Sequence, residues 1–157
     1  MSGADPNLDT LNRILAGRDC AGPTPDDVVS AAEATLGVNF PASYRVFLLH
    51  FGAGALPAPY DLHGLPTCRA SDAAPPAWSH LLDVDAQLRR YGDHPQKFLP
   101  IASDGCGVTI FLHVSRMSGS NECPVVARGP GFDDVDIAPS FLAFAEAAMS
   151  GDPLAAI

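Results

Sequence analysis

Basic residues are scarce in this chain of 157 residues, where nine Lys and Arg side chains face eighteen Asp and Glu side chains. The formal net charge of −9 would repel phosphate groups, which argues against a nucleic-acid-binding protein. Long apolar runs are also missing, since no stretch approaches the roughly 18 apolar residues of a membrane span. The N-terminal residues MSGADPNLDT lack the basic and apolar regions of a signal peptide. We therefore expect a cytoplasmic protein with no membrane span.

Motifs of metal, cofactor and catalytic sites are missing as well. No C-x-x-C pair occurs, so we expect the four scattered cysteines to stay reduced: Cys20, Cys68, Cys106 and Cys123. Neither H-E-x-x-H, nor G-x-x-x-x-G-K-[ST], nor G-x-S-x-G is present. His63 and Cys68 are only two possible zinc ligands, and such a pair is common by chance. The sequence thus predicts no catalytic residue, no metal and no cofactor.

Apolar residues make up 47% of the chain, and helical spacing governs them near both ends. We predict a first short helix capped by Asn7. A second helix is predicted after a Thr24–Asp27 capping box, and Gly37 ends it. A third helix, which carries a core-facing stripe of aromatic and Leu residues, ends at Gly52. A further helix is predicted from Asp83 to residue 91, and the last one follows residue 139.

Residues with strand propensity gather between these helices. Residues 98–102, 108–114 and 124–127 are rich in β-branched and aromatic side chains. Within the Pro/Gly-rich passage 52–80, residues 58–65 predict one short edge strand. Helices, then strands, then a helix indicate an α+β fold with a mainly antiparallel sheet flanked by helices. We expect one domain over residues 23–157, preceded by a loosely tethered helical segment over residues 1–22.

The stretch FLPIASDGCGVTIFLHV, residues 98–114, contains a small loop that allows three interpretations. A phosphate cradle is disfavoured, because a strand rather than a helix follows the glycines and no Lys follows them. A reactive Cys106 is disfavoured, because the neighbouring Asp104 would raise the pKa of its thiol. The remaining interpretation is a tight turn between two strands.

The segment GPGFDDVDIAP, residues 129–139, concentrates acidic residues. Alternation places Asp134 and Asp136 on one face of a strand, with Val135 and Ile137 on the other. These carboxylates, together with Asp133, are either a solvated acidic edge or a patch that binds a partner.

Four phrases of the chain together resemble the SUKH superfamily, in the same order and over about residues 25–149. They are AAEATLGVNFPASYRVFLLHFGAG, DLHGLP, FLPIASDGCGVTIFLHV and DIAPSFLAFAEAAM. The matching residues of the first phrase are Glu33, Leu36, Gly37, Phe40, Pro41, Tyr44, Phe47, Leu48, Phe51 and Gly52. Two positions depart from the family pattern: Val108 stands where an acidic residue is frequent, and Cys106 replaces a frequent Gly.

The resemblance implies an α+β domain that binds proteins rather than an enzyme. Many bacterial members look like immunity proteins that neutralise secreted toxins, often nucleases, and fungal members act as interaction modules in cell-wall regulation. On this basis we expect a basic protein partner, most simply a toxin domain. The residues expected to bind it are Asp104, Asp133, Asp134 and Asp136. Tyr60 and Trp78 are expected either as exposed aromatic anchors or as ordinary core residues. An intracellular adaptor without a toxin partner is the alternative, and a hydrolase that uses His and Asp is the third hypothesis.

Overall fold

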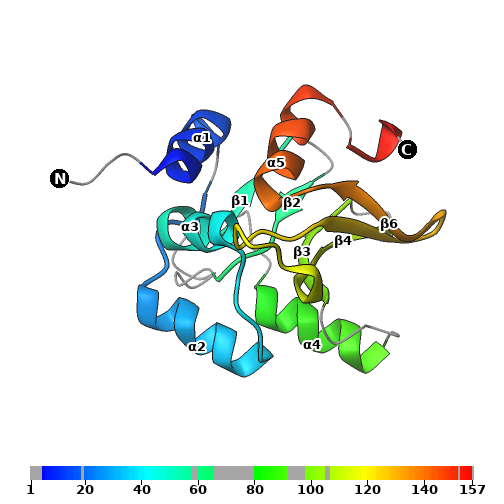
Figure 1. The fold of residues 1–157 in the computed structure, drawn as a ribbon, viewed down its shortest axis with the longest axis horizontal. Coiled ribbons are helices and arrows are strands. Elements are labelled where there is room, and N and C mark those ends of the chain that lie inside the picture. The colour runs from blue at the N-terminus through cyan, green and yellow to red at the C-terminus, as the bar shows by residue number, and fades with distance from the viewer. Residues whose placement is uncertain are drawn as a thin grey trace.

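The computed structural model of the chain describes residues 5–18, 20–57, 60–65, 80–91, 98–104, 107–151 and 153–156. Its α-helices are α1 (Pro6–Leu15), α2 (Asp26–Leu36), α3 (Ala42–Phe51), α4 (Leu81–Tyr91) and α5 (Phe141–Ser150). Its strands are β1 (Gly54–Ala55), β2 (Asp61–Leu62), β3 (Phe98–Ser103), β4 (Thr109–His113), β5 (Val125–Gly129) and β6 (Phe132–Ala138). Two short 3₁₀ helices follow β4 and α5, namely η2 (Val114–Arg116) and η3 (Pro153–Ala156) (Figure 1).

The six described strands form one antiparallel sheet in the order β1-β2-β3-β4-β5-β6. Each strand therefore pairs with its neighbours in sequence, which confirms the predicted α+β class and the pairing of β3 with β4. The predicted edge strand was misplaced, because β2 lies between β1 and β3 and the edge belongs to β1. The two-residue strand Gly54–Ala55 has no alternating pattern to reveal it in the sequence.

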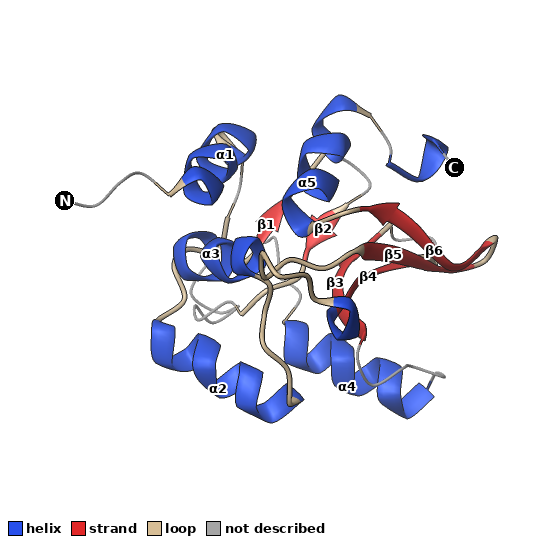
Figure 2. Ribbon diagram, viewed as in Figure 1, coloured by secondary structure: helices blue, strands red, loops and turns tan. Residues whose placement is uncertain are grey.

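The two faces of the sheet are covered differently (Figure 2). On one face, Ile110 and Leu112 join the large core that α1, α3 and α5 cover. On the other face, Phe111 packs with Phe98 and Val126, and Leu88 of α4 lies against them. Because successive side chains of β4 point to opposite faces of the sheet, they pack in two cores, the large one and a small one beside α4. The outer face of β6 carries exposed charged residues instead.

The apolar stripes of the helices are confirmed, but their caps differ from the prediction. Gly37 ends α2 in the left-handed conformation, with φ of 69°, as expected. Thr24 does not cap α2, because its buried hydroxyl donates to the carbonyl of Leu65, 2.8 Å away. Asp5 rather than Asn7 caps α1, and its side chain accepts the Asn7 N–H. Asp83 lies within the first turn of α4 rather than before it.

The N-terminal segment is more firmly packed than expected. Leu11 of α1 is fully buried, and Ile14 and Leu15 join the same core. Residues after α1 add backbone hydrogen bonds, from Ala21 N–H to the Ala53 carbonyl and from Gly22 N–H to the Phe51 carbonyl. The helix therefore belongs to the hydrophobic core, because its apolar face has no other way to leave water. The prediction of a loose tether did not anticipate this packing.

Candidate functional site

Several residues of the four sequence phrases make contacts that stabilise the fold. The Tyr44 hydroxyl donates to the carbonyl of His63 at 2.7 Å, which ties α3 to the chain after β2. Burial raises the pKa of this tyrosine, so the hydroxyl keeps its proton. The Glu33 carboxylate accepts the Phe40 N–H at 2.7 Å and so fixes the connection from α2 to α3.

Two motif glycines meet at a close backbone contact. A Cβ atom on Gly64 would collide with the carbonyl of Gly52, and the Leu65 N–H donates to that same carbonyl at 2.8 Å. Gly52 itself has φ of 74°, and a Cβ atom there would collide with the carbonyl of Gly22. Only glycine allows three segments to approach this closely. These glycines therefore have a structural role at the contact between the three segments.

Asp104 has a structural contact in the loop after β3. Its side chain accepts the Val108 N–H at 3.0 Å, and its own N–H donates to the Val108 carbonyl at 3.1 Å. These two bonds close the connection to β4, as expected of a tight turn. Cys106, at the centre of this loop, lies outside the described residues. Asp104 is therefore first a turn residue, and a role in binding would come in addition.

The three other acidic candidates lie together on β6, at one edge of the sheet. Asp133, Asp134 and Asp136 are all exposed, whereas Val135 and Ile137 are half-buried, as alternation predicted. Asp136 forms an ion pair with Arg116 of η2, at 2.9 Å between Oδ1 and Nη1. Asp134 forms one with Nε of Arg128 on β5, at 3.3 Å. We call Asp133, Asp134 and Asp136 the acidic strip.

Asp134 occupies a strained backbone position within this strip. Its φ is 54°, in the left-handed region that L-residues avoid and that Asp tolerates better than most. The pairing of β5 with β6 shifts register here, between Ala127 and Gly129, so two residues of β6 oppose the single Arg128. Such a bulge turns a strand locally and interrupts pairing at a sheet edge.

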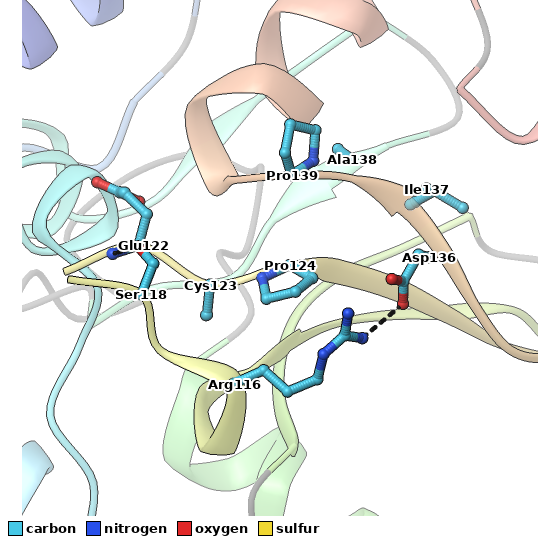
Figure 3. A pocket seen from close by; sticks show the side chains of 9 residues that line it. All are labelled: Arg116, Ser118, Glu122, Cys123, Pro124, Asp136, Ile137, Ala138 and Pro139. Atoms are coloured by element: carbon cyan, nitrogen blue, oxygen red, sulfur yellow. Dashed lines mark hydrogen bonds and ion pairs between the residues drawn. The ribbon is translucent and has the colours of Figure 1, made fainter. Parts of the chain in front are cut away.

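A cavity of about 540 Å³ opens where β6 ends (Figure 3). It lies between the end of β6, η2 and the loop that leads to β5. Pro124, Ile137 and Pro139 line it with apolar surface, and the Arg116–Asp136 ion pair also lines it. Figure 3 shows the Arg116 side chain reaching along the cavity toward Asp136.

Two further lining residues have roles in the fold. Glu122 accepts hydrogen bonds from Ser43 of α3, at 2.9 Å from its N–H and 2.8 Å from its hydroxyl. Cys123 is 1% exposed, and burial raises the pKa of its thiol to about 12, with a smaller contribution from the Glu122 carboxylate. The thiol is therefore protonated at neutral pH and is a poor nucleophile. Neither residue stood out in the sequence, because no local pattern marks a long-range contact.

Tyr60, one of the two aromatic anchors expected from the sequence, is buried rather than exposed. Tyr60 is 2% exposed, and its ring packs edge-on against Phe144 of α5, with 5.7 Å between ring centroids. The prediction of an exposed Tyr60 is therefore wrong, because the ring fills the space between α5 and the sheet. Trp78 and Cys68 lie outside the described residues.

The described residues contain neither a cluster of metal ligands nor a membrane-spanning helix. No three His, Cys, Asp or Glu side chains in this part of the chain are grouped closely enough to hold a metal ion. None of the described helices has the length and hydropathy needed to cross a membrane.

The fold and the exposed surface define an α+β domain built from a meander sheet, with charged groups and a cavity where β6 ends. Comparison with known families places this domain further. The model of the SMI1 / KNR4 family (SUKH-1) matches residues 22–147, which is most of the chain. The chain therefore belongs to this family, as the four sequence phrases suggested. No curated protein matches the chain in sequence.

Proposed function

We propose that this chain is an immunity protein that neutralises a cognate toxin by tight binding, without catalysis. Membership of the SMI1 / KNR4 family (SUKH-1) is the observation that carries the proposal. The net charge of −9 supports a basic partner, since opposite charge speeds encounter and sets register. A nuclease toxin is such a partner, because it needs a basic surface for its own substrate.

The acidic strip is the surface that we propose contacts the partner. Its carboxylates are exposed, and two of them are paired with Arg116 and Arg128. The Arg116–Asp136 pair is about half exposed, and such a pair contributes little to folding stability, so an arginine of a partner can replace or join Arg116 at small cost. A carboxylate that becomes buried against a partner arginine would contribute strongly, and its truncation would cost about 2–5 kcal/mol of binding.

The alternative is an adaptor that holds a resident protein of the cell, as in the cell-wall regulators of the same superfamily. The same family membership favours it, since both kinds of protein use this fold. It predicts a partner that is harmless when expressed alone, so the two proposals differ in a direct test.

The test expresses the C-terminal domain of the neighbouring gene product in a bacterial host, with and without this chain. Rescue of growth together with one-to-one co-purification supports the immunity proposal. A neighbour that is harmless, or that kills regardless of this chain, contradicts it. A pull-down from the native cytoplasm then tests the adaptor alternative.

Matched variants test the acidic strip within the same assay. The triple variant Asp133→Asn, Asp134→Asn, Asp136→Asn removes three negative charges from β6. The control removes three exposed aspartates elsewhere, at positions Asp9, Asp27 and Asp83. Loss of binding in the first triple alone supports the strip, whereas equal effects of the two triples would leave only the net charge as the cause.

A further inference from the structure

The cavity at the end of β6 has the composition of a site for one buried side chain. Its apolar lining comes from Pro124, Ile137 and Pro139, and its volume is about 540 Å³. Cavities of about 300–1,000 Å³ with an apolar lining and a few polar groups are typical of binding sites. Protein interfaces gain most of their affinity where an anchor side chain fills a pocket of this kind.

The charged groups at the rim indicate which kind of side chain the cavity can bind. Arg116 and Asp136 are each about half exposed, at 49% and 50% of their side-chain surfaces. A guanidinium beside an apolar cavity can stack on the face of an aromatic ring. If Arg116 turned to stack on such a ring, the Asp136 carboxylate would lose its partner and could accept a cation from the same ligand.

We propose that this cavity binds an aromatic side chain of the protein partner, and that Asp136 binds an arginine next to that aromatic residue. The inference rests on the proposed function only in taking the partner to be a basic protein. The charge of −9 favours a cationic segment over an acidic one. Two arginines would then be involved, Arg116 on the ring and the partner's arginine on Asp136.

The first experiment titrates the isotope-labelled full chain with short synthetic peptides and follows its backbone amide signals by NMR. One peptide carries a tryptophan between two arginines, a second replaces the tryptophan by alanine, and a third replaces both arginines by glutamates. We expect the first peptide to shift the amide signals of residues 116–123 and 136–138. The second and third should bind at least about tenfold more weakly.

Substitutions inside and outside the cavity test whether the first peptide binds there. Ser118 is exposed and lines the cavity, so Ser118→Trp should block it and abolish binding of the first peptide. Ser150→Trp adds the same side chain at an exposed position at the far end of α5 and should leave binding unchanged. Asp136→Asn should weaken binding about tenfold, whereas Asp83→Asn should not.

Three results would overturn the proposal: no amide shift at about 1 mM peptide, equal affinity for the tryptophan and alanine peptides, or binding that survives Ser118→Trp. The peptide test is independent of the growth rescue. If rescue fails while the peptide binds at the cavity, the immunity proposal falls and the cavity site remains. If rescue persists in Ser118→Trp while no peptide binds, the cavity site falls and the immunity proposal remains.

Discussion

The contact between Glu122 and α3 offers a sharp test of how this fold is held together. Helix α3 begins after Pro41 and has no side-chain cap of its own. Glu122, 79 residues further on, accepts the Ser43 N–H and hydroxyl instead, at 2.9 and 2.8 Å. Ser43 is fully buried, so truncation of Glu122 removes the acceptor of two groups that lie inside the fold.

Replacement of Glu122 by Ala should therefore lower the free energy of unfolding by about 3 kcal/mol. A hydrogen bond to a charged group contributes about 1.5–3 kcal/mol and a helix cap about 1 kcal/mol, and these two terms overlap here. Glu122→Gln keeps one acceptor and should cost about half as much. Urea denaturation of the full chain measures each loss.

Glu146→Ala is the matched control, because its carboxylate pairs with Arg13 at the surface, with side-chain exposures of 47% and 67%. It should cost less than about 1 kcal/mol. In a double-mutant cycle with Ser43→Ala, the coupling free energy between Glu122 and Ser43 should account for most of the stability lost in Glu122→Ala. A Glu122→Ala loss no larger than that of Glu146→Ala would refute the reasoning.

Three further predictions concern stability, each measured by urea denaturation. Gly64→Ala should lower the free energy of unfolding by about 1–3 kcal/mol, because the added Cβ atom would collide with the Gly52 carbonyl. Gly119→Ala is the control and should change the free energy of unfolding little, because open space surrounds Gly119. Similar losses in the two variants would contradict the close contact at Gly64. Asp134→Val should lower the free energy of unfolding by about 1–2 kcal/mol, because φ is 54° at this position and a β-branched residue avoids that conformation. Asp134→Gly should stay within about 0.5 kcal/mol of the parent protein, because glycine adopts positive φ readily. Equal losses in the two variants would exclude backbone strain as the cause. Burial lowers the pKa of His63 below its ordinary value of 6.5, so the folded chain binds this proton less readily than the unfolded chain. The free energy of unfolding should therefore fall as the pH drops below about 6.5, and less steeply in His63→Asn; an unchanged slope would show that His63 does not contribute.

Residues that hold the fold and residues of the exposed surface would respond differently to substitution. The motif residues Tyr44, Gly52 and Gly64 hold the chain together through buried contacts. Substitutions there test the fold and would reduce any binding indirectly. Asp133, Asp136 and the cavity rim can change with little cost to the fold, because their groups are exposed. A loss of binding in variants of this surface would therefore report on recognition itself.

Local signals in the sequence determined the helices and most of the sheet. The stripe that begins at Tyr44, the glycine stop at Gly37 and the strand-forming runs on either side of residues 104–107 all appear in the structure. Each of these signals acts within a few residues, through side-chain periodicity or backbone conformation, so it can be read without knowing the fold. The alternation that placed Asp134 and Asp136 outward has the same origin.

Only the tertiary structure decided which groups meet. Thr24 has the residue type of a helix cap, yet its hydroxyl donates to Leu65, 41 residues away. Tyr60 was expected at the surface and lies against Phe144 in the core. The acidic strip acquired its arginine partners, and the cavity its walls, from segments that come together only after β4, β5 and β6 pair. A hydrogen bond or a cavity depends on the positions of two distant segments at once, and no pattern within one segment contains that information.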